Sequence, residues 1–335
     1  MRRWRRLVGS WRLRCPVVVV KLKRGYVSKD SYDVKNCKIT VDVSEFDDLD
    51  EMILQICNTE TTGSDPYDED DWYRILKVGY DSKVYVQNCI DGVVSTKVAT
   101  TWAGSTGELT IDVCDGAIAF YEDGDLVYSE PYALPSYDCY LYVFTSTLRS
   151  RSSGTDKFDD FTFAPTPSFW DYFEDVDDPY WWTVDWGSWQ VQDGKLENTD
   201  SASMIHSNDP CFHVGHVRTE MKTTNAGSST WHVGWLMVKW INWDNCVYAL
   251  LHKDGGVELT VISGGDKNMY TNTSNLTPLN KHAFDVSIIG NTARMWIDGT
   301  LYVTANDAYF DDWHGHPGCR TDNAFAELDS FTGIK

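Results

Sequence analysis

The chain has 335 residues, enough for two domains that each bury a core, and its 29 basic and 50 acidic residues give a net charge of −21. Residues 1–29 hold ten of the basic residues and no acidic one, so residues 30–335 carry 19 basic against 50 acidic residues, a net charge of −31. A body this acidic repels phosphate backbones, which argues against nucleic acid as a partner.

The first residues are basic, as at the start of a signal peptide, but no apolar stretch follows them. The longest purely apolar run near the start is Val17–Val20, so the sequence predicts no membrane span and shows no signal peptide in the chain as given. Frequent Val, Thr, Tyr and Trp, interrupted by Gly, Asn and Asp, are typical of short strands joined by turns. The composition therefore predicts an all-β protein.

The predicted elements occur twice along the chain, in the same order. The first copy begins with W-x4-G-S-W at 4–11 and the second with the same pattern at 182–189. Strands of matching alternation follow, then a hairpin with Asp-Gly at its tip, then a closing strand. The matching pairs are 39–43 with 217–221, 118–128 with 293–303, and 159–163 with 328–332. Four ordered matches predict a duplication.

A Pro-containing segment at 164–168 separates the two copies. The sequence thus predicts one domain over residues 1–165 and another over residues 166–335. Each is expected to be an antiparallel β-sandwich, since both copies consist of short alternating strands and tight turns.

Several motifs of the second copy resemble the concanavalin A-like (laminin-G-like) jelly-roll superfamily. They are an aromatic and acidic opening strand, W-x4-G-S-W, V-x-D-G-x-L, and three later strands, at 169–175, 182–189, 191–196, 245–250, 297–301 and 328–331. The resemblance covers residues 169–335 well and residues 4–163 more weakly. It implies two tandem jelly rolls, with glycan or adhesive binding as the commonest use of the fold.

The first copy differs from the second at its start. About a dozen residues, Phe169 to Trp181, precede the W-x4-G-S-W of the second copy, and three precede that of the first. The first sandwich is therefore predicted to lack its opening strand. Its open sheet edge would favour self-association through the first domain.

One acidic cluster comes close to a known catalytic motif. Glycosidases of this fold use carboxylates in the pattern E-x-D-x-x-E or one residue longer. The nearest match, from Glu45 to Glu51, exceeds this spacing, falls in an expected loop, and has no acidic counterpart in the second copy. His314 and His316 lack a third metal ligand and are expected to be exposed. The sequence therefore predicts that the chain is not an enzyme.

The distribution of tryptophan points to a sugar site in the second copy. That copy holds 11 of the 15 Trp. Trp240 and Trp243 stand next to Asn242, Asp244 and Asn245, so an aromatic platform would lie beside groups that hydrogen-bond to sugar hydroxyls. These five residues are the candidate carbohydrate-binding site, although core packing explains a Trp about equally well.

Calcium is a candidate structural cofactor. Glu174 and Asp175 of the opening strand and Asp329 of the closing strand would lie close together in a jelly roll and could share a cation. The nine cysteines, an odd number without a CxxC pair, leave two interpretations open: buried thiols, or some disulfides in a protein outside the cell.

Taken together, the sequence predicts a non-catalytic, carbohydrate-binding (lectin-like) protein, extracellular or displayed on a surface such as that of a cell or virion, with polysaccharide or glycan as its partner. One alternative is a structural subunit of a filament, surface layer or virion. A carbohydrate-active hydrolase is the weaker alternative, since the carboxylate pattern is absent.

Overall fold

The computed structural model describes residues 19–22, 25–28, 31–45, 50–58, 71–101, 106–114, 116–147, 157–165, 169–171, 173, 182–208 and 215–334. It forms two compact units. One consists of residues 1–112, 121–124 and 134–166, and the other of residues 113–120, 125–133 and 167–335. The sheets are described below by the repeat to which their strands belong.

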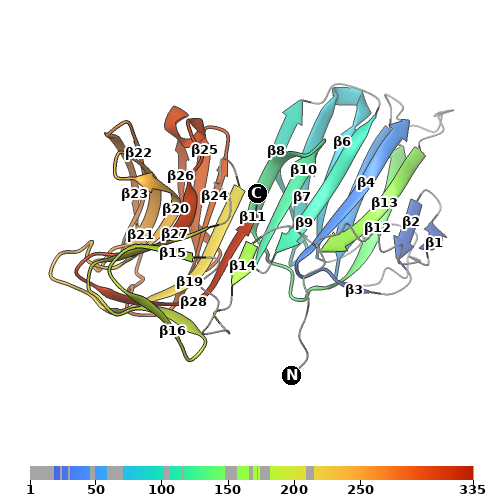
Figure 1. The fold of residues 1–335 in the computed structure, drawn as a ribbon. Helices are drawn as coiled ribbons and strands as arrows, with labels where there is room; N and C mark the ends of the chain where they lie inside the picture. Colours follow the sequence, from blue (N-terminus) through green and yellow to red (C-terminus); the bar gives the residue numbers. More distant parts are fainter. Residues whose placement is uncertain are drawn as a thin grey trace. The chain divides into compact units, whose positions relative to one another are not determined.

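Strands of the first repeat form two antiparallel sheets (Figure 1). The eight-stranded sheet has the order β1-β2-β12-β5-β6-β7-β8, with β3 also paired to β12. Its strands are Val19–Leu22, Gly25–Ser28, Asp138–Thr147, Asp50–Cys57, Trp72–Val78, Lys83–Ile90 and Val93–Thr101, with β3 at Tyr32–Asp33. The five-stranded sheet, β11-β10-β9-β4-β13, comprises Asp125–Pro131, Ala117–Glu122, Gly107–Cys114, Cys37–Glu45 and Lys157–Pro165.

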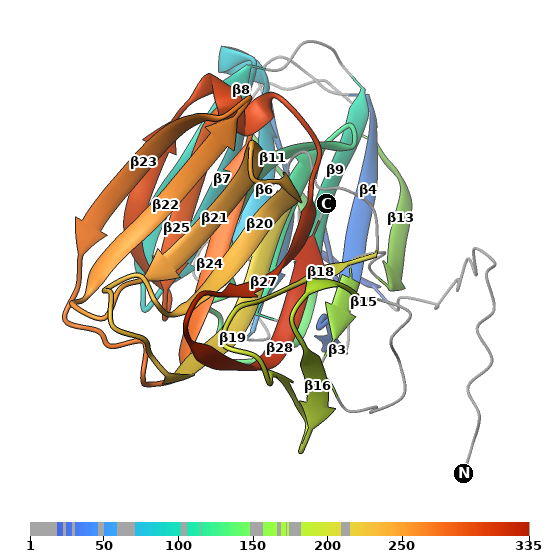
Figure 2. The same ribbon diagram turned by 60° about the vertical axis from the view of Figure 1, so that its left-hand side comes forward.

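Strands of the second repeat also form two antiparallel sheets. The seven-stranded sheet has the order β15-β18-β27-β20-β21-β22-β23. Its strands are Trp182–Trp186, Ser203–Ser207, His316–Thr321, Gly234–Asn242, Asn245–Leu251, Gly256–Ser263 and Asp266–Thr273. Strands β20 to β23 lie side by side in Figure 2. The eight-stranded sheet is β16-β17-β28-β19-β24-β25-β26, with β14 paired to β28. These strands are Trp189–Gln192, Lys195–Asn198, Phe325–Ile334, Gly215–Asn225, His282–Ile289, Thr292–Ile297 and Thr300–Asn306, with β14 at Phe169–Asp171.

The two sheet pairs confirm the predicted fold of two tandem antiparallel β-sandwiches. The repeated strands occupy equivalent positions, because β4 lies between β9 and β13 just as β19 lies between β24 and β28. Both predicted hairpins are present, β10 with β11 and β25 with β26. At their tips Asp123 and Gly124, and Asp298 and Gly299, all have positive φ, which matches the twist of the paired strands.

The opening strand distinguishes the two sandwiches. In the second, β14 and β17 both pair with β28. In the first, β13 is the equivalent strand and stands at the end of its sheet, and among the described residues none pairs with its outer edge. The described part of the first sandwich therefore lacks the strand that the sequence comparison found missing.

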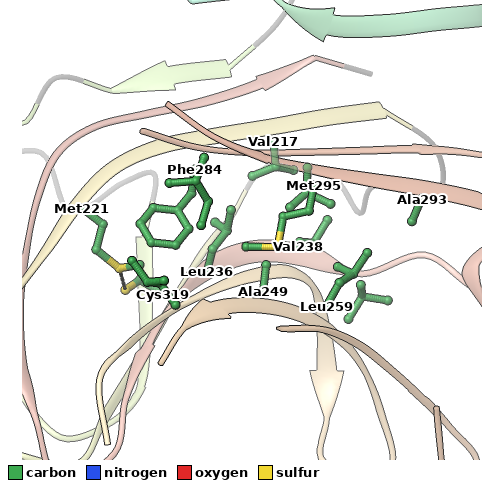
Figure 3. Packing of buried hydrophobic residues seen from close by; sticks show 14 of the residues in the cluster. Val217, Met221, Leu236, Val238, Ala249, Leu259, Phe284, Ala293, Met295 and Cys319 are labelled. Carbon is green, nitrogen blue, oxygen red and sulfur yellow. Dashed lines mark hydrogen bonds between the residues drawn. The ribbon is translucent and has the colours of Figure 1, made fainter. Parts of the chain in front are cut away.

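A hydrophobic core fills the space between the two sheets of the second sandwich (Figure 3). It draws alternate residues from each strand, such as Leu236 and Val238 of β20 and Phe284 and Val286 of β24. Cys319 lies in this core against Met221, with 3.9 Å between the two sulfur atoms. This packing uses one face of each sheet and leaves the other face of the seven-stranded sheet for a second group of side chains.

None of the seven cysteines that the structure describes forms a disulfide, and six of them are buried. Burial raises the pKa of Cys246 to about 12, so this thiol stays protonated at neutral pH. Of the two open interpretations, buried thiols therefore hold for six of these seven, Cys37 being half-buried, while Cys15 and Cys211 lie outside the described residues. No described helix has the length and apolar character needed to span a membrane.

Candidate functional site

The outer face of the seven-stranded sheet carries an aromatic cluster where a solvated surface would be expected. Outward-pointing residues of β18, β20 and β21 build it, with Trp186 from β15 packed against them. Its buried members are Met204, Val233, Trp235, Met237, Trp240, Cys246, Tyr248 and Leu250. This set is separate from the core between the sheets, so the face is assembled from residues that the core does not need.

An irregularity in β20 decides which side chains join this face. Strict alternation after Trp235 and Met237 would place Lys239 outward and Trp240 inward. The pairing of β20 with β21 shifts between Met237 and Lys239, so Trp240 joins the outer cluster instead. A bulge of this kind re-aims one side chain, and here it adds an indole to the face.

Three indoles meet at the end of β20. The rings of Trp240 and Trp243 are 4.9 Å apart between centroids, and each lies 5.7 Å from the ring of Trp186. Trp240 is 5% exposed and Trp243 is 44% exposed. Trp240 therefore supports the cluster, and Trp243 presents an indole to solvent.

The remaining predicted sugar-site residues shape the turn around Trp243. The side-chain oxygen of Asn242 accepts hydrogen bonds from the Asp244 N–H at 3.0 Å and from the Asn245 amide at 3.3 Å. The side-chain oxygen of Asn245 accepts from the Gly264 N–H at 3.1 Å. The structure thus brings all five predicted residues together, with two amides fixing the turn and the Asp244 side chain exposed.

Arg320 of β27 links the exposed indole to the sheet. Its guanidinium carbon lies 4.1 Å from the ring centroid of Trp235 and 4.2 Å from that of Trp243. Its Nη2 donates a hydrogen bond to Asp322 Oδ2 at 2.7 Å, while burial lowers the pKa of Arg320. Sequence reasoning missed this residue, since no motif marks a strand arginine that stacks on distant aromatic rings.

A buried carboxylate lies on the same face, on β22. Glu258 is the cross-strand neighbour of Leu250, a member of the aromatic cluster. Its two oxygens accept hydrogen bonds from His252 Nε2 at 2.9 Å and Thr260 Oγ1 at 2.7 Å. Burial alone would raise the pKa of Glu258, but these bonds and the nearby Lys267 lower it, so the group is ionised at neutral pH.

Two histidines lie near the first strands of the sheet. The rings of His206 and His316 are 4.9 Å apart, and the Nδ1 of each is 3.0 Å from the carbonyl oxygen of Ser207. His314, the other histidine noted in the sequence, is exposed. Within the described ranges, no group of three or more His, Cys, Asp or Glu residues could hold a metal ion.

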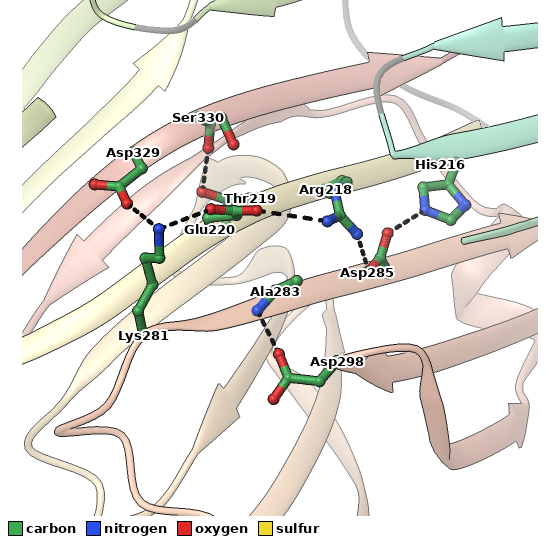
Figure 4. Close-up of polar contacts among 10 residues, drawn as sticks. All are labelled: His216, Arg218, Thr219, Glu220, Lys281, Ala283, Asp285, Asp298, Asp329 and Ser330. Atoms are coloured by element: carbon green, nitrogen blue, oxygen red, sulfur yellow. Dashed lines mark hydrogen bonds and ion pairs between the residues drawn. The ribbon is translucent and has the colours of Figure 1, made fainter. Parts of the chain in front are cut away.

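The calcium hypothesis remains a prediction. Glu174 and Asp175 lie outside the described residues. Asp329 belongs to a polar network on the outer face of the eight-stranded sheet, where its Oδ2 is 2.6 Å from Lys281 Nζ (Figure 4). Lys281 also lies 3.2 Å from Glu220, so this carboxylate already faces an ammonium group.

The acidic segment from Glu45 to Glu51 joins β4 to β5. Residues 46–49 and the Glu45 side chain lie outside the described part of the chain.

No family model and no curated protein match the chain. Solved structures do match parts of it. A carbohydrate-binding module (CBM66) from Bacillus subtilis is 17% identical over 46% of this chain and 95% of its own, with a TM-score of 0.40. The β-glucanase of Bacillus licheniformis is 14% identical over 50% of this chain and 98% of its own, with a TM-score of 0.42. An endo-β-1,3-glucanase from Pyrococcus furiosus is 15% identical over 50% of this chain and 93% of its own, with a TM-score of 0.38. These likenesses concern the fold alone.

The matched structures correct the functional expectation drawn from the sequence. A non-catalytic binding or structural protein, with no enzymatic activity, was predicted. The solved structures that share the fold are mostly glucanases and transglycosylases by name, which contradicts that prediction. A missing E-x-D-x-x-E pattern was insufficient ground for excluding an enzyme, because the motif identifies one catalytic arrangement and leaves others untested.

Proposed function

We propose that the outer face of the seven-stranded sheet binds a polysaccharide. The observation that carries this proposal is the exposed indole of Trp243, supported by Trp186 and Trp240 and flanked by Asn242 and Asp244. The C–H groups of a pyranose ring stack on such a surface, and the adjacent polar groups bind its hydroxyls. The names of several solved structures with this fold refer to carbohydrates, which agrees with this class of ligand.

Replacing Trp243 with Ala is expected to weaken polysaccharide binding about tenfold, which corresponds to about 1.4 kcal/mol, because the stacking surface is lost. Binding is measured by isothermal titration calorimetry against a panel of neutral glucans, mannans, galactans and xylans. Leu301→Ala is the matched control, since Leu301 is a similarly exposed apolar residue on β26 of the other sheet. Equal affinities of Trp243→Ala and wild type, or no binding to any member of the panel, would refute the proposal.

Glycoside hydrolysis is a second candidate function for the same face, and Glu258 is the observation that favours it. Hydrolysis of this kind uses a pair of carboxylates, one of them ionised as nucleophile or base. Glu258 is buried, hydrogen-bonded and held ionised on the face that carries the aromatic cluster.

If the chain hydrolyses polysaccharide, Glu258→Gln should lower the release of reducing ends at least 100-fold while leaving binding within about twofold, because the shape is kept and the charge is lost. Glu220→Gln, on the outer face of the other sheet, is the control and should keep full activity. Activity that survives Glu258→Gln, or wild-type protein that releases no reducing ends from the panel, would remove this candidate.

Two finer proposals accompany the carbohydrate ligand. Polysaccharides are met mainly outside the cell, so we place the chain in the extracellular space or on a surface. Self-association through the first domain is supported by the outer edge of β13, which has no partner among the described residues.

A further inference from the structure

Two exposed tryptophans border the aromatic cluster, one just before β20 and one just after it. Trp231 is 41% exposed and Trp243 is 44% exposed. Trp235 and Trp240, the cluster's other indoles on β20, are 7% and 5% exposed. The face therefore offers two stacking surfaces with a buried aromatic layer beneath them.

These two indoles belong to one continuous contact path. The ring of Trp231 is 6.3 Å from the ring of Trp235, and the Trp235 Nε1–H donates to the Trp231 carbonyl at 3.0 Å. The guanidinium of Arg320 lies 4.1 Å from Trp235 and 4.2 Å from Trp243. The two exposed rings thus lie within about 15 Å of each other, at opposite ends of the path.

We propose that this path is an extended subsite for several consecutive units of a neutral polysaccharide, with Trp231 and Trp243 as its two stacking ends and Arg320 as the residue that positions Trp243. The inference rests on the proposed function and deepens it. One pyranose covers one indole, so a ligand that uses both exposed rings at once must be a longer chain.

The charges near this surface favour an uncharged polymer. The positive charge of Arg320 is balanced by Asp322, and that of Lys267 faces Glu258 at 3.9 Å. His206 Nε2 lies 3.6 Å from Asp185. Since these basic groups face carboxylates and the chain has a net charge of −21, an acidic polysaccharide would meet overall repulsion.

The positioning role of Arg320 follows from its two planar contacts. Trp243 stands in the turn after β20, where its neighbours Asn242 and Asp244 are exposed. The guanidinium holds its ring from β27, while Asp322 fixes the guanidinium. The lysine ammonium is a point charge with no planar surface to stack on an indole, so a lysine at position 320 should hold the ring of Trp243 only partly.

The test uses a ladder of oligosaccharides, from single sugar to hexasaccharide, derived from the neutral polysaccharide that the full chain binds best. Affinity is expected to rise with length until both indoles are covered. Trp231→Ala and Trp243→Ala should each lower the affinity for the hexasaccharide about tenfold and that for the disaccharide less than about threefold. A matched acidic ladder, made of uronic-acid units, should bind at least tenfold more weakly.

Arg320 is tested with and without ligand. Arg320→Met should lower hexasaccharide affinity about as much as Trp243→Ala, and should speed the oxidation of Trp243 by N-bromosuccinimide, read by peptide mass spectrometry. Arg320→Lys should show a hexasaccharide affinity and a Trp243 oxidation rate between those of Arg320→Met and wild type. Oxidation of Trp243 at an unchanged rate in Arg320→Met would overturn the positioning role, because that rate requires no ligand.

The outcomes separate the two proposals. A hexasaccharide affinity that is the same in Trp243→Ala and wild type contradicts the proposed function itself. Binding that depends on Trp243, but neither increases with length nor responds to Trp231→Ala, leaves the proposed function standing and overturns the extended subsite.

Discussion

Replacing Trp240 with Ala should lower the free energy of unfolding of the second sandwich by about 3–5 kcal/mol, the range for deleting a buried aromatic side chain. Trp240 is 5% exposed, and its ring packs against those of Trp186 and Trp243. Its removal would leave a cavity in the aromatic layer. Urea unfolding of the full chain, followed by Trp fluorescence and circular dichroism, measures the change.

Trp243→Ala is the matched comparison, since it deletes the same kind of side chain from the exposed side of the same cluster. With 44% of Trp243 exposed, its removal should cost about 1 kcal/mol. The two substitutions therefore separate support from binding: Trp240→Ala destabilises, and Trp243→Ala weakens sugar binding in a stable protein. Equal losses of stability would show that the two indoles are not layered in this way.

Most of the fold was predictable from local sequence patterns. Alternation and the two Asp-Gly turns are properties of neighbouring residues, and both predicted hairpins form, with Asp123 and Asp298 at positive φ. The repeat then placed 39–43 and 217–221 at equivalent positions, as β4 and β19 show. Which sheet face carries a second aromatic layer depends on contacts between distant strands, and alternation alone does not encode that.

The candidate site was predictable in part. Trp240, Trp243 and their polar neighbours are adjacent in sequence, so their proximity required no long-range information. Their separate roles depend on the shifted pairing between Met237 and Lys239, which has no sequence signature. Arg320 and Glu258 reach the face from β27 and β22, and only the sheet order reveals that they join it.

Lys239 is the clearest example of a residue whose role no sequence pattern indicates. It is 1% exposed, and its Nζ donates hydrogen bonds to the carbonyl oxygens of Phe310 at 2.5 Å and Trp313 at 3.1 Å. These carbonyls lie in and after the short 3-10 helix Ala308–Asp311. Burial lowers the pKa of Lys239 from 10.5 to about 8, although Asp311 and Asp312 oppose the change.

This lowered pKa predicts a stability difference that rises with pH. Between about pH 8 and 10.5 the unfolded chain keeps the proton of Lys239 and the folded chain has released it, so a higher pH favours folding. The stability of wild type minus that of Lys239→Met should therefore increase by about 3 kcal/mol across this window. Using the difference removes the contribution of the buried thiols, which both proteins share.

Urea unfolding at closely spaced pH values, with a reductant present, provides the measurement, and Lys281→Met provides the control. Lys281 is exposed, and its hydrogen bonds to Asp329 and Glu220 raise its pKa. Its stabilising effect is present below the unfolded pKa of 10.5 and is lost as the pH rises through the higher folded value. The two difference curves should thus have opposite signs, and a Lys239 curve that is flat or falls with pH would show that its ammonium group is not destabilised by burial.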